Sequence, residues 1–368
     1  MTRIVVIGAG VLGASAAFHA ALAGAEVVLV DQAHPGRATA AGAGIVCPWA
    51  SGADDPAWHR IAQAGARYYP TLVQHLAACG ETEIGYRRVG ALCVAVEQAE
   101  LEQIARVLRA RHATAPEMGE VSRLSPAEAR RLFPPLRVDL AAVHIGGGAR
   151  VDGRLLAAAL RRATERRGGR FQPGTAELLA EGARVTGARV GAETVAADCV
   201  VLAAGAWAPA LLAPLGLTLA VAPQRGQITH LRLEGVETGA WPIVLPQSSH
   251  YLLAFEGGRV VVGATREAGT GFDLRVTAGG QAEVLNEALA VAPGLAPATL
   301  VETRVGFRPV GRDVRPMLGR AALDGLVIGN GLGPTGLTIG PYAGRLLAQA
   351  ALGEVPEMDL AAYDLGRT

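Results

Sequence analysis

Residues 4–31 read IVVIGAGVLGASAAFHAALAGAEVVLVD and contain four successive elements. The first four residues are apolar and β-branched, as expected for a parallel strand that is covered on both faces. A glycine turn over residues 8–13, GAGVLG, leads into a helix of small apolar residues. A second apolar strand over residues 27–30 ends at Asp31. This order of strand, glycine turn, helix, strand and acid predicts a βαβ unit.

The three glycines of the turn have separate physical roles. Gly8 permits the tight turn, Gly10 lets a pyrophosphate approach the backbone, and Gly13 lets the helix lie close to the sheet. Asp31 follows the glycines by about 20 residues, where an acid accepts hydrogen bonds from a ribose. The segment therefore predicts a dinucleotide site. The alternative is a helix turn that merely tolerates glycine.

Two apolar runs require a test for a leader or a membrane span. A signal peptide has a basic start and one apolar block, whereas residues 4–30 are broken by glycines and contain His19 and Glu26. Residues 199–223 carry no charge and are long enough to cross a bilayer, but Pro209, Pro214 and Gly216 interrupt them. We expect neither run to span a membrane.

Composition limits the classes of function. The 368 residues exceed the size at which single cores stop growing, so two domains are expected. A net charge of +1 argues against a nucleic-acid partner and a polybasic membrane patch. The four cysteines have no metal-type spacing, so we expect no metal site, and free thiols in apolar contexts favour a cytoplasmic location. Lysine is absent, which removes any lysine-based chemistry.

The remaining chain alternates between helix and strand patterns. Small residues fill positions 36–46, which suits a backbone that runs along a flat ligand, although a flexible loop has the same composition. Helical spacing predicts helices at 58–78, 99–111, 126–132, 155–167, 279–291 and 340–352, the last with Pro341 at its start. Strand patterns occur at 85–96, 176–179, 184–190, 199–202, 227–233, 251–255, 259–264, 300–307 and 326–329.

The order of these patterns predicts the fold class. Nucleotide-binding segments come from the start, middle and end of the chain, and sheet-rich segments are inserted between them. We expect a Rossmann-like α/β domain assembled from residues 1–84, 145–220 and 309–368. The inserted residues 85–144 and 221–308 are expected to form an antiparallel-sheet α+β domain that binds substrate.

Five blocks in order resemble the flavin-dependent family of D-amino-acid oxidase, glycine oxidase and sarcosine oxidase. The blocks are GAGVLG with VD (8–13, 30–31), GRATAAGAGIV (36–46), ARVDGRLLAAAL (149–160) with VVLAAGAWA (200–208), PQRGQ (223–227) with RVVVGATRE (259–267), and GFRPVGRDVRPMLG (306–319) with GNGLGPTGLTIGP (329–341). They cover nearly the whole chain, and as a set they are specific to the family rather than to one substrate.

The resemblance implies FAD as the cofactor and assigns its contacts. Together with the turn glycines, the residues that it places around the adenosine and pyrophosphate are Val11, Leu12, Asp31, Gln32 and Ala176. The residues that it places along the ribityl chain and the flavin ring are Arg37, Thr39, Ala43, Gly44, Ile45, Ala204, Gly205 and Trp207. The segment Gly333, Pro334, Thr335, Gly336, Leu337 and Thr338 is expected to close over the flavin. Because no cysteine lies near residues 306–319, we expect the FAD to be held without a covalent bond.

The closing segment also has a physical reading that is independent of the family. A glycine loop followed by a helix start aims backbone N–H groups and the positive end of the helix dipole at one spot. Such preorganised dipoles stabilise negative charge that develops on a bound group. A glycine cap followed by an ordinary helix would account for one or two of these glycines, but not for the whole set.

The resemblance also assigns substrate residues. Arg308 is expected to form a two-pronged pair with a substrate carboxylate, and the alternative is a surface arginine before a proline. Tyr251 matches a tyrosine that contacts substrate in glycine oxidase, and Arg266 would favour a substrate with a second acid if it faces the pocket. Trp49 and His250 are candidate pocket walls, with a polar strand end as the alternative for His250.

Two positions depart from the family pattern. Pro334 stands where glycine oxidase has an arginine, so a small amino acid would lose one anchor. Leu332 replaces a histidine that is common in this loop, which argues against acid–base chemistry there.

The expected activity is transfer of a hydride to FAD from the carbon that bears the amine of an amino acid. A D-amino acid, glycine or an N-alkyl amino acid are the candidate substrates, and oxygen, a quinone or a carrier protein is the candidate acceptor. The alternatives are oxidation of a 2-hydroxy acid or a glycerol-type alcohol, and a non-catalytic FAD-binding subunit. Homo-oligomers are compatible with this chemistry.

Overall fold

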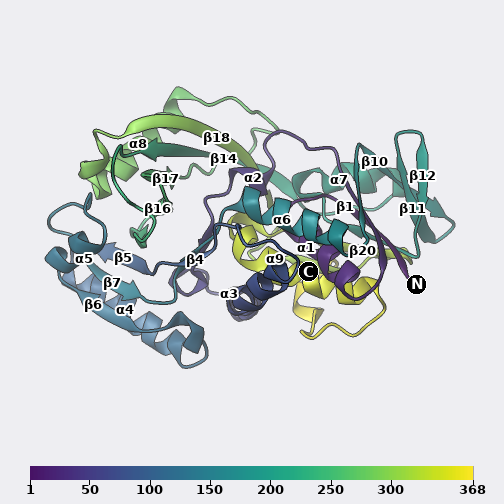
Figure 1. Cartoon of the computed structure of the whole chain (residues 1–368), viewed down its shortest axis with the longest axis horizontal. Coiled ribbons are helices and arrows are strands. Elements are labelled where there is room, and N and C mark those ends of the chain that lie inside the picture. Colours follow the sequence, from purple (N-terminus) through teal and green to yellow (C-terminus); the bar gives the residue numbers. More distant parts are fainter. Residues whose placement is uncertain (368) are drawn as a thin grey trace.

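A mostly parallel sheet forms one half of the molecule in the computed structural model, which describes residues 1–367 (Figure 1). Its strand order is β19-β20-β13-β1-β2-β9, in which only β19 runs antiparallel to its neighbour. The strands are β1 (Arg3–Ile7), β2 (Glu26–Asp31), β9 (Arg170–Pro173), β13 (Cys199–Leu202), β19 (Met317–Arg320) and β20 (Leu326–Asn330). Segments from the start, middle and end of the chain therefore lie side by side in one sheet.

This sheet is covered on both faces, which explains its continuous apolar strands. Ile4 and Val6 of β1 pack into a core shared with the helices, whereas Val5 and Ile7 pack into a second core on the other face. The helical layer consists of α1 (Val11–Leu22), α3 (Pro56–Ala77), α6 (Gly153–Arg166) and α9 (Gly336–Ala351). The other face carries a three-stranded sheet of β10 (Ala176–Glu181), β11 (Arg184–Val190) and β12 (Glu193–Ala196).

Glycines let α1 and α9 cross at backbone contact distance. A Cβ atom added at Gly344 would lie 2.6 Å from the carbonyl oxygen of Leu12 and 2.8 Å from the amide nitrogen of Ala16. A Cβ added at Gly340 would lie 2.8 Å from a methyl group of Val11. Since both helices begin at the same edge of the sheet, the close crossing brings their N-termini together.

The last helix begins one turn earlier than its sequence indicated. We expected Pro341 at the start of the helix, but α9 begins at Gly336 and contains Pro341 in its interior. A proline has no N–H to donate to the carbonyl four residues before it, which is that of Leu337. The hydroxyl of Tyr69 on α3 donates to this carbonyl instead, and Ser15 of α1 donates to the carbonyl of Pro341 at 2.6 Å. The Tyr69 hydroxyl therefore replaces the hydrogen bond that the proline removes, and the Ser15 hydrogen bond is a further contact between α1 and α9.

An eight-stranded sheet forms the other half of the molecule, on the left of Figure 1, in the order β18-β14-β17-β16-β15-β5-β7-β6. Its strands are β5 (Ala91–Ala95), β6 (Val121–Leu124), β7 (Ala141–Ile145), β14 (Ala222–Arg232), β15 (Ile243–Leu245), β16 (Tyr251–Ala254), β17 (Arg259–Gly263) and β18 (Thr299–Val310). Helices α4 (Gln98–His112), α5 (Pro126–Leu132) and α8 (Ala278–Val291) pack against it. The antiparallel pairing of β14 with β18 places Gln224 opposite Arg308 and Arg225 opposite Phe307.

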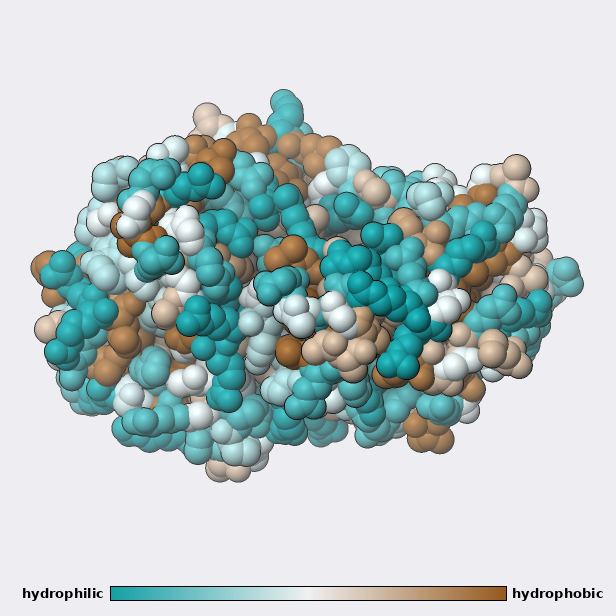
Figure 2. Space-filling model, in the orientation of Figure 1, coloured by the Kyte–Doolittle hydropathy of each residue, from teal (hydrophilic) through white to brown (hydrophobic). Residues whose placement is uncertain are grey.

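Short elements connect the two halves. They are α2 (Ala38–Ala41), α7 (Ala208–Leu212) and a small sheet of β3 (Ile45–Val46), β8 (Ala149–Arg150) and β4 (Arg87–Arg88). The strand expected over residues 85–96 is divided into β4 and β5, with Gly90 at a positive φ of 80° between them. The exact division of the chain into two domains stays a prediction. No helix in the described residues has both the length and the apolarity to cross a membrane, and hydrophilic residues cover most of the face shown in Figure 2.

The close crossing of α1 and α9 predicts the effect of adding one methyl group. Gly344→Ala places a Cβ against backbone atoms that cannot move aside, so we expect a loss of about 1–3 kcal/mol in the free energy of unfolding. Gly279→Ala is the matched control, because a Cβ on this helical glycine of α8 meets no atom within 4 Å. Chemical denaturation of both variants tests this, and equal stabilities would contradict the packing argument.

Buried His19 on α1 predicts a loss of stability in mild acid. Burial lowers the pKa of His19 to about 4, and its neutral ring lies 2.7 Å from the Ser15 carbonyl and 2.5 Å from the Tyr68 hydroxyl. Between pH 6.5 and 4 the unfolded chain binds a proton that the folded chain does not. This group therefore reduces the free energy of unfolding by up to about 1.4 kcal/mol per pH unit as the pH falls through that window.

Denaturation midpoints measured at pH 7 and pH 5 test this effect. We expect His19→Gln to reduce the difference between the two midpoints, whereas His112→Gln at the exposed end of α4 should leave the difference unchanged. A difference that is the same in wild type and His19→Gln would show that other groups cause the acid sensitivity.

Candidate active site

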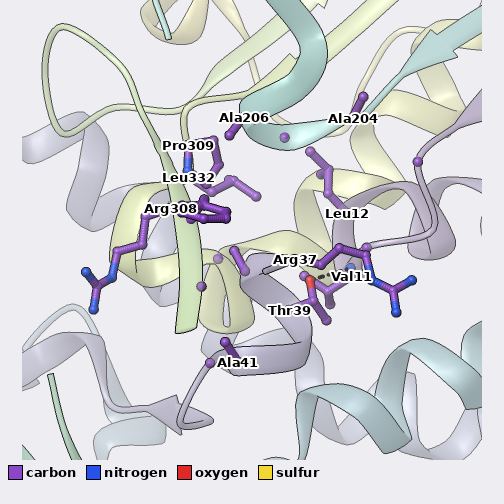
Figure 3. Close-up of a pocket in the computed structure, with 18 of the residues that line it drawn as sticks. Val11, Leu12, Arg37, Thr39, Ala41, Ala204, Ala206, Arg308, Pro309 and Leu332 are labelled. Carbon is purple, nitrogen blue, oxygen red and sulfur yellow. Dashed lines mark hydrogen bonds between the residues drawn. The ribbon is translucent and has the colours of Figure 1, made fainter. Parts of the chain in front are cut away.

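One cavity of about 490 Å³ lies where the two halves meet. Its walls come from the ends of β1, β2, β13 and β20, from the start of α9, and from β14, β16 and β18. Most predicted cofactor residues line it: Gly8, Gly10, Val11, Leu12, Asp31, Gln32, Arg37, Thr39, Ala43, Gly44, Ile45, Ala176, Ala204, Gly205, Trp207, Gly333, Pro334, Gly336 and Leu337. Figure 3 shows part of this wall, with Arg308 and Arg37 on opposite sides of the view.

The first wall is the glycine turn before α1. Gly8 has φ of +105°, and α1 begins after Gly10 without a side-chain cap or an acid in its first turn. The amide of Val11 donates to the Thr39 hydroxyl at 3.0 Å, the dashed line in Figure 3. Gly13 does not line the cavity, because it lies against the backbone of Gly8, where a Cβ would overlap the Gly8 carbonyl. This arrangement leaves the positive end of the helix next to the cavity.

Asp31 supports the glycine turn from the end of β2. One carboxylate oxygen accepts from the amide of Ala9 at 2.6 Å, and the other accepts from the amide of Ala33 and lies 3.4 Å from Arg37. Each carboxylate oxygen has two lone pairs, so a further hydrogen bond from a ribose can be accepted. Next to it, Gln32 accepts from the Thr175 hydroxyl at 2.6 Å, in the segment that leads to Ala176.

The opposite wall is the loop between β20 and α9. Gly333 has φ of +50° and a Cβ there would meet no atom within 4 Å, so the backbone borders open space. Helix α9 begins without a side-chain cap or an acid in its first turn. The sequence pattern missed Asn330, a buried residue at the end of β20 that donates to the Gly205 carbonyl at 2.9 Å and accepts from the Gly331 amide at 2.8 Å. A polar residue at the carboxyl end of a parallel strand was the available signal.

Aromatic side chains link the two halves at one side of the cavity. The ring of Trp207 stacks on His34 at 4.5 Å and on Phe272 at 4.9 Å between centroids, and Phe307 meets both Trp207 and Phe272 edge-on. Of these, only Trp207 was expected at the site. His34 and Phe272 lie in irregular segments, where periodicity gives no signal.

The substrate side of the cavity contains Arg308, Tyr251 and Arg266. Arg308 lies on β18 over Gly226, and its Nη1 donates to the Thr265 carbonyl at 3.0 Å. Burial lowers the pKa of Arg308 from its ordinary value, and it raises the pKa of Tyr251 to about 12 while both arginines oppose that rise. The hydroxyl of Tyr251 therefore stays protonated at neutral pH and remains a donor.

Four other expected residues do not line the cavity. Trp49 is 2% exposed in the helical core, where its carbonyl accepts from Arg111 at 2.5 Å. His250 lies between Glu283 and Glu287 of α8, at 3.4 and 3.7 Å, which is the polar strand-end alternative. The expectation that these two side chains form pocket walls is not met. Thr335 and Thr338 lie on the α9 side but bond to the protein backbone, at Leu332 and Ile45.

The residues present fit a dinucleotide such as FAD. Two uncapped helix starts face one cavity with an acid at the end of β2, and open space borders the glycines of the closing loop. Such helix starts bind phosphate and stabilise negative charge. All four cysteines are free and buried, and none of them lines this cavity.

Comparisons with known proteins agree with this geometry. The chain is 55% identical to iminodiacetate oxidase (IdaA) from Chelativorans sp. BNC1, whose crystal structure matches with a TM-score of 0.96 over 99% of both chains. It is 47% identical to the uncharacterised oxidoreductase YurR of Bacillus subtilis strain 168, over 99% of this chain and 98% of that protein. It is 32% identical to glycine oxidase of Pseudomonas aeruginosa, over 98% of each. The family of FAD-dependent oxidoreductases termed DAO matches residues 3–350, and the chain belongs to this family.

Proposed function

We propose that this protein oxidises the carbon next to the nitrogen of an amino acid that carries a second carboxylate, as in iminodiacetate. The observation that carries the proposal is the presence of two guanidinium groups, Arg308 and Arg266, in one cavity with Tyr251, where both positive charges act on the tyrosine hydroxyl. The similarity to iminodiacetate oxidase supports the same substrate class.

Each side chain has a distinct part in binding. Arg308 is half-buried and already bonded to the Thr265 carbonyl, so it offers its remaining N–H groups in a fixed orientation to the carboxylate next to the reacting carbon. Tyr251 donates its hydroxyl proton to the same carboxylate. Arg266 is exposed at the cavity wall and binds the second carboxylate.

FAD, when bound, accepts the hydride that leaves the carbon. The substrate nitrogen loses its proton to solvent, and the resulting imine is hydrolysed by water, which for iminodiacetate gives glyoxylate and glycine. The protein contributes orientation and exclusion of water, and no proton needs to pass through a side chain. The side chains of Leu332 and Pro334 at the cavity wall are apolar, so Arg308 and Arg266 are the charged anchors on the substrate side of the cavity.

We further propose that the FAD is held without a covalent bond and that oxygen accepts its electrons to form hydrogen peroxide. The support is the absence of cysteine from the cavity wall and the oxidase activity named for the similar IdaA and glycine oxidases. The cytoplasmic location expected from the free cysteines stays a prediction, and so does the oligomeric state.

The two arginines predict different effects on substrate selectivity. Arg308→Gln should lower kcat/KM about 10- to 100-fold for every amino acid, because it removes a charge-assisted contact with the carboxylate that all of them share. Arg266→Gln should cause a similar loss for iminodiacetate but leave N-ethylglycine within about twofold, since that substrate has no second acid. Arg232→Gln, on the exposed end of β14, is the control. Equal effects of Arg266→Gln on both substrates would contradict its assignment.

The activity itself is tested by mixing the yellow holoenzyme with substrate without oxygen. We expect iminodiacetate to bleach the flavin absorbance, and oxygen to restore it with one hydrogen peroxide per glyoxylate formed. A panel with glycine, D-alanine, N-ethylglycine and lactate defines the substrate class. No bleaching by any amine would overturn the proposal, and bleaching by lactate alone would select hydroxy-acid oxidation.

A further inference from the structure

The guanidinium of Arg308 lies across strand β14 at Gly226. Arg308 is on β18, where its strand partner is Gln224, and its Nη1 donates at 3.0 Å to the carbonyl of Thr265 on the other side of β14. Gly226 lines the cavity together with Arg308. A Cβ atom added at Gly226 would lie 2.6 Å from both Nη atoms of Arg308 and 2.7 Å from its Cζ. The guanidinium therefore occupies the place that a side chain at position 226 would take.

The backbone of β14 does not itself require glycine at this position. Gly226 has no positive φ, and it pairs with Gly306 within the regular antiparallel register of β14 and β18. Glycine in the interior of a strand usually weakens the strand, because it has no side chain to pack and loses more chain entropy on folding. The space above the strand, rather than a backbone conformation, thus explains the glycine.

The same glycine is a neighbour of Arg266. Residues 265–267 run antiparallel beside residues 225–227, joined by two 2.9 Å backbone hydrogen bonds at one end and one of 3.3 Å at the other. The middle residues of the two segments, Gly226 and Arg266, therefore lie next to each other, and both line the cavity. Burial lowers the pKa of Arg308, and the positive charge of Arg266 also lowers it. Two guanidinium groups thus lie close together around a position that has no side chain.

We propose that Gly226 is a positioning residue for recognition of the substrate carboxylate. Because position 226 has no side chain, the Arg308 guanidinium rests against β14 and keeps its hydrogen bond to the Thr265 carbonyl. Its remaining N–H groups are then held in one orientation for a carboxylate. A methyl group at position 226 would push the guanidinium off the strand and break that hydrogen bond. This inference rests on the proposed function, because it concerns how the carboxylate next to the reacting carbon is held.

The effect of such a methyl group falls on binding rather than on folding. The atoms that it would meet belong to the far end of a flexible side chain, which can turn aside. At Gly344, by contrast, the added methyl group would meet backbone atoms. We therefore expect Gly226→Ala to retain its flavin and to have the same denaturation midpoint as wild type.

Binding of carboxylates that contain no amine tests the proposal on the yellow holoenzyme. Thiodiacetate and (methylthio)acetate carry sulfur in place of the substrate nitrogen, and the change in flavin absorbance measures their binding. We expect Gly226→Ala to weaken both ligands at least about 10-fold, because both contain the carboxylate that Arg308 binds. Gly279→Ala on α8 is the matched control, since its Cβ meets no atom within 4 Å, and it should bind both ligands as wild type does.

A double variant shows whether the methyl group acts through Arg308. In Arg308→Gln the guanidinium is absent, so adding Gly226→Ala should change the affinity for either ligand by less than about twofold. A further loss as large as that in the wild-type background would overturn the proposal, and so would unchanged binding by Gly226→Ala alone. If Gly226→Ala does not fold, recovery of folding in the double variant supports the clash with the guanidinium, and no recovery contradicts it.

The same affinities separate this inference from the proposed function. If wild type binds thiodiacetate but does not oxidise iminodiacetate, the proposed function fails while the role of Gly226 can still be judged from the variants. If wild type binds neither carboxylate, the role of Gly226 in carboxylate recognition is excluded.

Discussion

The backbone contact between α1 and α9 is the constraint on which the site depends. Each helix start supplies uncapped N–H groups, but a single helix start binds one group at most. The glycines at 340 and 344 allow the axes to approach until side-chain atoms would overlap backbone, and this brings both starts to one cavity. The interior proline of α9 is tolerated because Tyr69 of α3 donates to the Leu337 carbonyl, the acceptor that the proline leaves without a donor. The packing of these three helices therefore also sets the positions of the N–H groups that would bind the cofactor.

This architecture could be predicted because the residues that indicate it follow each other closely in the chain. A β-branched run, phased glycines and an acid at a strand end follow each other within the first 31 residues, and the observed strands and helix lie there. The three-part origin of the parallel sheet and the alternation in the antiparallel sheet were also visible. The short strands β6, β7, β9, β12, β15 and β19 were not, because most of them contain a polar or charged residue that interrupts the apolar run by which the equally short β1, β13 and β20 were found.

The side chains of the candidate site were less predictable from sequence. Arg308, Tyr251 and Arg266 lie in the cavity where the family resemblance put them, but Trp49 and His250 do not, since neighbouring residues in a chain can face opposite sides. His34 and Phe272 were missed because their positions depend on contacts between segments far apart in sequence, whereas Asn330 carried a local signal as a polar residue at the end of a parallel strand. The start of α9 was misplaced because a proline usually opens a helix, and nothing in the sequence reveals that Tyr69 lies beside it.

The stacked rings of His34, Trp207 and Phe272 have a consequence for how ligands enter. They join the two halves beside the cavity, while Arg225 of β14 pairs with Glu267 and Asp273, which lie on either side of Phe272 in the chain. The stacking geometry of an aromatic pair contributes only about 0.5–1.5 kcal/mol beyond its buried area, and Phe272 is 45% exposed, so it buries only part of its ring. Glycines at 269 and 271, both at positive φ, allow the intervening backbone to bend. An opening that bends the backbone at these glycines would therefore move Phe272 away from Trp207 and leave Arg308, which lies on β18, in place.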